Sequence, residues 1–208
     1  MIESDRQISA VQREVGTRPL DGGQGRVVSI AQTYPTGAED LWEACTAPGR
    51  LARWFLPVTG DLRQGGRYRL EDGTEGSIET CDPPRGFSAT WEVQGEVSRI
   101  EVELAPDPSG GTRLRIAHIV SEDEHWDRYG PGAAGVGWDL SLLGLAAHLA
   151  GDRAGGGEEW AAGPEGIAFL AEASACWGRA DIAAGTDADR ARTRAARTGA
   201  FYTGGPEE

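Results

Sequence analysis

The longest apolar stretch of the chain, residues 136–149, predicts a helix that is buried on most of its circumference. At about 100° per residue, its large apolar side chains fall on two separate arcs, whereas a surface helix has one. Small or polar residues form a narrow stripe between these arcs, and its members are Gly137, Ser141, Gly144 and His148. This small-residue stripe could roof a ligand cavity, or it could simply let the helix approach a sheet closely.

Alternation of apolar and polar residues predicts antiparallel strands upstream of that helix. Each segment carries one apolar and one polar face, as in a sheet that is covered on one side only. Turn signals such as Asp72-Gly73 separate the segments. The predicted strands are a short one that ends at 61–62, followed by 67–70, 76–81, 87–93, 99–104 and 113–120.

A strand and two short helices are predicted before this set. Residues 26–34 are rich in β-branched side chains and predict the strand. Thr36 is expected to cap a helix over 37–46, with Glu39 as its capping-box partner. Pro48 suits the start of the second short helix.

The region that follows the strands contains the long helix and two further helices. Residues 121–130 are interpreted as a polar, acidic connection, and Pro131 opens the long helix. Pro164 can start another helix, and Thr186 or Asp187 can cap the last one. One face of the Pro164 helix is apolar and either packs back on the chain or builds a homodimer; it carries Ile167, Leu170, Ala173 and Trp177.

This order of elements predicts an α+β fold of two layers, in which a curved antiparallel sheet leaves its concave side to the long helix. The expected organisation is an N-terminal extension over 1–25, a main domain over 26–151 and a helical C-terminal extension over 152–208.

Charge excludes two classes of partner. The chain has 33 acidic and 20 basic residues, all of the latter Arg, and a net charge of −13. Nucleic acids and anionic membrane surfaces need a basic patch, so neither is expected.

Cys45, Cys81 and Cys176 are far apart and match no disulfide or zinc pattern, and no leader or membrane span is recognised. A cytoplasmic location is therefore expected.

At this point an ordered set of short motifs resembles a known family. The motifs are Asp40-Leu41-Trp42, Thr46-Ala47-Pro48, 51–55, 60–63, 65–68, 76–79, Pro83-Pro84, Thr90-Trp91-Glu92 and 111–114 with His118, and the long helix from Gly137-Trp138 follows them. Together they resemble the activator of Hsp90 ATPase (AHSA1-like) family of the START-like, or SRPBCC, helix-grip superfamily. The resemblance covers residues 26–151. It implies a sheet that grips a long C-terminal helix. This chain adds a helical C-terminal extension to the family pattern.

The resemblance also implies a cavity between the sheet and the long helix. Pockets of this kind are mostly apolar, with a few placed polar groups. Aromatic side chains and the small-residue stripe are the expected lining. The predicted ligand-binding residues are Trp54, Phe55, Tyr68, Trp91, His118, Trp138, Ser141, Gly144 and Leu145.

Two histidines are the candidates for chemistry. His118 lies on the apolar face of its strand, where it is either a core histidine or a ligand anchor and acid–base catalyst. His125 stands among acidic residues, and a solvated acidic loop is favoured there over a metal site. No metal or cofactor is predicted.

Three functions remain open from the sequence. The first is binding of a small hydrophobic molecule without an assigned reaction. The second is a cyclase or dehydratase acting on a polyketide-like substrate, with His118 as acid and base. The third is a module that contacts a chaperone or a regulator. Only His118 can be named as a polar group in the cavity, which favours binding over catalysis.

Overall fold

The computed structural model describes residues 4–20, 23–152 and 157–205. The chain divides into two compact units, which are described separately. One unit is continuous and spans residues 31–120, and the other combines residues 1–30 with 121–208. An antiparallel sheet with helices on either side of it in the sequence confirms the predicted α+β class.

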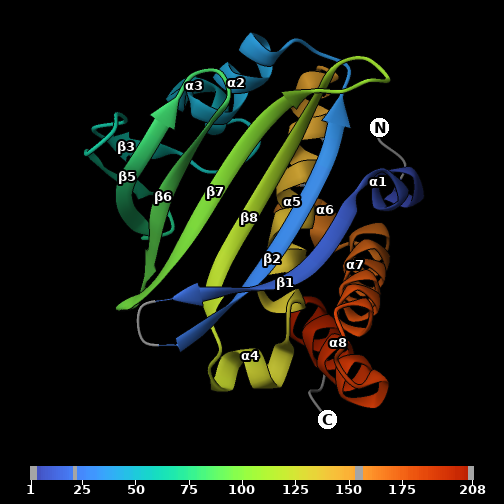
Figure 1. Ribbon diagram of the computed structural model, residues 1–208. Helices are drawn as coiled ribbons and strands as arrows, with labels where there is room; N and C mark the ends of the chain where they lie inside the picture. Colours follow the sequence, from blue (N-terminus) through green and yellow to red (C-terminus); the bar gives the residue numbers. More distant parts are fainter. Residues whose placement is uncertain (1–3, 21–22, 153–156, 206–208) are drawn as a thin grey trace. The chain divides into compact units, whose positions relative to one another are not determined.

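The continuous unit contains most of the sheet. Over the described residues, the sheet has eight strands in the order β1-β2-β8-β7-β6-β5-β4-β3, so it is open, with β1 (Gln12–Leu20) and β3 at its edges. Five antiparallel pairings join consecutive strands from β3 to β8, as the meander predicted (Figure 1). The strands are β2 (Gly23–Tyr34), β3 (Val58–Gly60), β4 (Arg67–Leu70), β5 (Glu75–Asp82), β6 (Gly86–Val93), β7 (Glu96–Pro106) and β8 (Thr112–Ser121).

Two short helices, α2 (Ala38–Thr46) and α3 (Pro48–Leu51), follow β2. Pro48 is the first residue of α3, as predicted. The expected cap of α2 is wrong by one residue: Gly37 is the N-cap, and it provides no side-chain hydrogen bond. The Thr36 hydroxyl instead donates a hydrogen bond to Oδ2 of Asp40, with 2.7 Å between the two oxygens. Thr36 thus contacts the first turn of α2 as a donor, from the residue before the N-cap.

The discontinuous unit is built mainly from helices. Its elements are α1 (Ser4–Ala10), β1 (Gln12–Leu20), α4 (Glu124–Tyr129), α5 (Gly132–Leu149), α6 (Glu158–Ala161), α7 (Pro164–Ala183) and α8 (Ala188–Thr203). The segment 121–130 is therefore not a plain connection, because it contains α4. Asp123 caps α4 by accepting from the Trp126 amide at 2.8 Å, and the Trp126 side chain is buried.

The apolar face of α7 is covered within this unit. Leu170, Ala173 and Trp177 are buried, whereas Ile167 stays 42% exposed. Gly135 of α5 makes room for the Trp177 indole, since a Cβ at this position would lie only 2.2 Å from an indole carbon. The α7 face thus packs against its own chain, and a homodimer through it stays a prediction.

A buried ion pair joins three elements of the same unit. Asp139 of α5 is fully buried and pairs with Arg13 of β1, whose Nη2 lies 2.5 Å from its Oδ1. Trp177 of α7 donates its indole N–H to Oδ2 of Asp139 at 2.8 Å. Burial is the largest influence on the Asp139 carboxyl and raises its pKa, while Arg13 and Trp177 act in the opposite direction.

The turn between α7 and α8 confirms Asp187 as a helix cap. Its Oδ1 accepts from the amides of Asp189 and Arg190, both at 3.1 Å. We expect Asp187→Ala to lower the free energy of unfolding by about 1 kcal/mol, because two amides lose their acceptor. Urea unfolding followed by circular dichroism measures this loss. Asp187→Asn keeps a capping oxygen and should cost less than half as much; an equal loss for both variants would contradict the assignment.

Candidate functional site

A cavity of about 320 Å³ lies in the continuous unit. Its lining comes from α2, from the α3 segment and the loop after it, and from strands β3 to β7. The lining side chains are uncharged, and most are aliphatic or aromatic. They are Trp42, Cys45, Thr46, Leu51, Phe55, Val58, Leu62, Tyr68, Leu70, Ile78, Cys81, Pro83, Phe87, Ala89, Trp91 and Ile100.

Two aromatic pairs connect the helical segments to strand β6. Trp42 of α2 meets Phe87 edge to face, with ring centroids 6.1 Å apart. Phe55, which follows α3, lies against Trp91 with centroids 6.4 Å apart. All four rings are only partly buried, in contrast to the core ring of Tyr34. Apolar surface that is left unfilled inside a pocket is what a hydrophobic ligand would cover.

The Tyr68 ring crosses the neighbouring strand at a glycine. Tyr68 of β4 pairs with Gly76 of β5, and its hydroxyl donates to the main-chain oxygen of Thr90 in β6 at 2.7 Å. A Cβ on Gly76 would come within 2.8 Å of the Tyr68 ring and 2.0 Å of the Thr90 oxygen. Burial, followed by the nearby Glu92 carboxylate, raises the Tyr68 pKa well above its ordinary value. The phenol therefore stays protonated and holds its ring in place in the cavity wall.

The Cys45 thiol in the lining is not an activated nucleophile. Cys45 is buried on α2, and burial raises its pKa to about 12. A thiol with so high a pKa is almost entirely protonated at neutral pH and reacts slowly. Cys81 of β5 is half-buried and free. Both thiols act here as small apolar side chains.

His118 lies on the buried face of β8 and borders the cavity without lining it. Its Nε2 is 2.8 Å from Oγ of Ser98, and its ring meets Trp91 with centroids 6.0 Å apart. The Ser98 hydroxyl donates to the main-chain oxygen of Trp91 at 3.1 Å, so its single hydrogen is used. The imidazole must then donate from Nε2 to Ser98. Burial lowers the His118 pKa to about 4, so the ring is neutral at physiological pH.

The structure brings only part of the predicted site together. Phe55, Tyr68 and Trp91 line the cavity. Trp54 is next to it: its indole donates to the Ala44 oxygen at 3.0 Å, and its ring lies 5.6 Å from that of Phe55.

The remaining predicted residues belong to α5 in the other unit. Ser141 donates its hydroxyl to the Gly137 oxygen at 2.8 Å, and Trp138, Gly144 and Leu145 are buried. Their assignment to a ligand site stays a prediction. Trp42 and Phe87 line the cavity but were not predicted to do so, although Phe87 alternates with Trp91 and therefore shares its face of β6.

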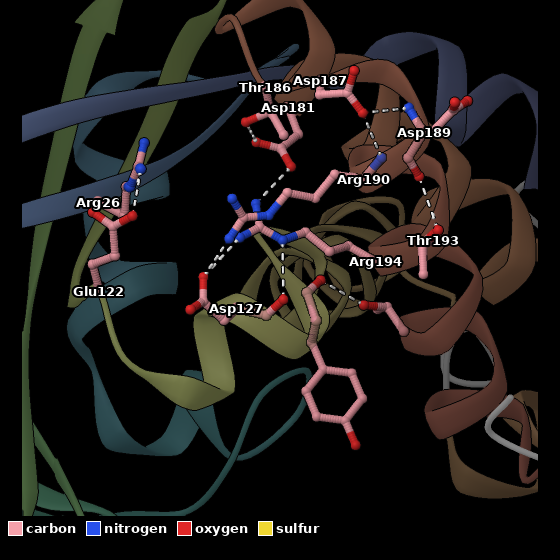
Figure 2. Close-up of polar contacts among 12 residues, drawn as sticks. Arg26, Glu122, Asp127, Asp181, Thr186, Asp187, Asp189, Arg190, Thr193 and Arg194 are labelled. Carbon is pink, nitrogen blue, oxygen red and sulfur yellow. Dashed lines mark hydrogen bonds and ion pairs between the residues drawn. The ribbon is translucent and has the colours of Figure 1, made fainter.

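A second cavity, of about 290 Å³, lies in the discontinuous unit at the turn between α7 and α8. Its lining carries three arginines, and Figure 2 shows that carboxylates engage them. Oδ1 of Asp127 accepts from Arg190 at 2.6 Å and from Arg194 at 3.2 Å. The lining residues are Arg26, Ala184, Gly185, Thr186, Asp187, Arg190 and Arg194.

The charges around this second cavity are balanced. Arg26 pairs with Glu122 at 2.6 Å, and Arg194 also contacts Asp181 at 3.3 Å. Together with Asp127, three carboxylates therefore pair with three guanidinium groups. An anion would meet no excess of positive charge, so this cluster is best explained as a network that joins α4, α7 and α8.

The described residues contain neither a metal-binding cluster nor a helix suited to a membrane. Within residues 4–20, 23–152 and 157–205, no group of three or more His, Cys, Asp or Glu side chains could hold a metal ion. His125 is exposed on α4 and stacks on Tyr129, with centroids 4.9 Å apart. None of the described helices is both long and apolar enough to span a bilayer.

Comparison with known proteins identifies the family. The family described as "Activator of Hsp90 ATPase homolog 1-like protein" matches residues 35–150. The solution structure of CalU16 from Micromonospora echinospora is 30% identical, with a TM-score of 0.71 over 84% of this chain and 97% of that one. Its crystal structure is 29% identical, with a TM-score of 0.68 over 82% and 98%.

A more distant match shares the fold alone. The HSP90 activator PFC0360w from Plasmodium falciparum is 21% identical, with a TM-score of 0.51 over 60% of this chain and 96% of that one. No curated protein matches the chain. The resemblance predicted from the motifs is confirmed, and the chain belongs to the family of activator of Hsp90 ATPase homolog 1-like proteins, with a fold of the helix-grip class.

Proposed function

We propose that the protein binds a small hydrophobic molecule in the cavity between α2, α3 and the sheet. The observation that carries this proposal is the lining: sixteen uncharged side chains around about 320 Å³, with four partly exposed aromatic rings. Covering these rings with an apolar ligand would gain about 25 cal/mol for each Å² removed from water. The helix-grip superfamily contains lipid and hormone binders, which agrees with this role.

The same lining favours binding over catalysis. Acid–base chemistry needs a carboxyl, imidazole or other proton-transfer group within hydrogen-bond reach of the substrate. None of the sixteen lining residues carries a carboxyl or an imidazole. His118 is outside the lining, and it shares its Nε2 hydrogen with Ser98, which has already donated its own hydrogen. The Ser98–His118 pair is therefore not arranged as a nucleophile and its base.

Binding can be tested with N-phenyl-1-naphthylamine, an uncharged dye whose fluorescence rises in apolar surroundings. We expect saturable binding with one site per chain. Trp91→Ala removes one aromatic wall and should weaken binding about tenfold, since a ring contact and its buried area are lost. Fluorescence titration of both proteins measures the two dissociation constants.

Phe201→Ala is the matched control. Phe201 is an aromatic residue of α8, is 58% exposed and does not line the cavity. This variant should bind the dye as the parent protein does. Absence of saturable binding, or an equal loss in both variants, would contradict the proposed function. Native mass spectrometry of the protein purified from its own host can then identify the natural ligand.

A further inference from the structure

We infer that the cavity selects a flat, uncharged aromatic molecule and rejects carboxylates, including free fatty acids. This inference rests on the proposed function and specifies its ligand class. It follows from the spacing of the side chains along β6 and from the hydrogen bonds that the lining has already made.

Strand β6 sets the distance between the aromatic walls. Phe87, Ala89 and Trp91 alternate on one face of the strand and all line the cavity. At a rise of about 3.3 Å per residue, the Cα atoms of Phe87 and Trp91 are about 13 Å apart. Ala89 lies between them, is buried at 1% exposure and carries the smallest side chain of the lining. The result is a floor with an aromatic pair at each end.

Each end of the cavity is formed by two aromatic rings, which present a ring edge or a tilted ring face to a ligand. Trp42 stands at an interplanar angle of 79° to Phe87, and Phe55 at 47° to Trp91. Aromatic rings attract one another in edge-to-face and offset arrangements, beyond the gain from buried area. A flat ring system between the two pairs can make such contacts at both ends. A flexible alkyl chain of the same area cannot make them, and it loses more rotational freedom on binding.

The polar groups of the lining exclude an anion. No lining residue is charged. The Tyr68 hydroxyl donates to the Thr90 oxygen at 2.7 Å, and the Thr46 hydroxyl donates to the Trp42 oxygen at 2.7 Å. The hydroxyl oxygens of Tyr68 and Thr46 keep lone pairs, so each can accept a hydrogen bond from a ligand hydroxyl. The charge of Arg50 acts on the lining residue Cys45, but Arg50 is already paired with Asp40 at 2.7 Å. A carboxylate would therefore meet no cation in the lining, and burying an unpaired charge is strongly unfavourable.

Three ligands of similar size test the inference by isothermal titration calorimetry at pH 7.5. They are 2-naphthol, 2-naphthoate and 1-decanol. We expect 2-naphthol to bind at least about tenfold tighter than either of the others, because 2-naphthoate carries an unpaired charge and 1-decanol has no aromatic ring to contact the ring pairs. Equal or tighter binding of the naphthoate or of decanol would overturn the inference.

A cavity-filling variant gives a second, independent measurement. Ala89→Leu should reduce 2-naphthol affinity at least about tenfold, because the larger side chain occupies the space between the ring pairs. Because Ala89 is only 1% exposed, the larger side chain should also lower the melting temperature by a few degrees. Circular dichroism at the temperature of the titration checks that the variant is folded. Ala105→Leu, on the exposed side of β7, is the matched control and should bind normally.

The two proposals fail in different ways. If N-phenyl-1-naphthylamine does not bind, the proposed function is wrong. If the dye binds, but Ala89→Leu keeps full affinity for 2-naphthol or the charged ligand competes equally, the function stands and the ligand class is wrong.

Discussion

Asp139→Ala is expected to lower the free energy of unfolding by about 3–5 kcal/mol, because it leaves the buried Arg13 guanidinium without its carboxylate. The Arg13 side chain is only 6% exposed, and no water replaces the lost partner easily. Two main-chain oxygens, of Ile8 and Val11, still accept from Arg13 at 3.2 Å, so some of its hydrogen bonds survive. Urea unfolding followed by far-ultraviolet circular dichroism measures the loss.

Two variants separate the contribution of the Asp139 charge from that of its hydrogen bonds and from that of an exposed ion pair. Asp139→Asn keeps an oxygen for the Trp177 indole and removes only the charge, so its loss should be smaller than that of Asp139→Ala. Glu172→Ala breaks an exposed pair with Arg179 on α7 and should cost less than about 1 kcal/mol. A similar small loss for Asp139→Ala would show that the buried pair contributes little to stability.

His118 is expected to make the protein less stable in mild acid. Burial lowers its folded-state pKa from 6.5 to about 4. Above pH 6.5 the ring is neutral in both the folded and the unfolded chain, and the contribution of His118 is fully present. As the pH falls from 6.5 towards 4, the unfolded chain takes up a proton that the folded chain does not. The free energy of unfolding should therefore fall by about 3 kcal/mol over this window.

His118→Gln isolates this contribution, since an amide can still donate to Ser98 but does not titrate. Urea unfolding of both proteins between pH 7.5 and 4 should give curves that converge as the pH falls. His125→Gln replaces the exposed histidine of α4 and should follow the parent curve. Parallel curves for the parent and His118→Gln would show that the imidazole is not held neutral by burial.

The strands and the main helices could be predicted because their apolar positions repeat with a clear period. Strand β4 (Arg67–Leu70) was predicted at its observed bounds, and α7 begins at Pro164 as expected. The elements missed have little such pattern. The α4 helix is six residues long and buries one side chain, Trp126, while β1 carries mostly polar residues.

The site depended on contacts between segments far apart in the sequence. Trp91 was predicted because it lies on the apolar face of its own strand. The pairing of Trp42 with Phe87 depends on how α2 lies over the sheet, which no local pattern specifies. The neutral state of His118 likewise depends on the register that places it opposite Ile100 and near Ser98. Periodicity thus gave the face of each side chain but not its partner.

The division of the chain has a consequence for the order in which the protein can form during translation. Residues 31–120 follow one another without interruption, so the ribosome delivers that unit as a whole. The other unit begins with residues 1–30 and is completed only by residues 121–208. Asp139 lies 126 residues after Arg13 in the sequence, so it is synthesised that much later. At about 5–20 residues per second this delay is about 6–25 s, during which the Arg13 guanidinium lacks the carboxylate that neutralises it in the folded protein.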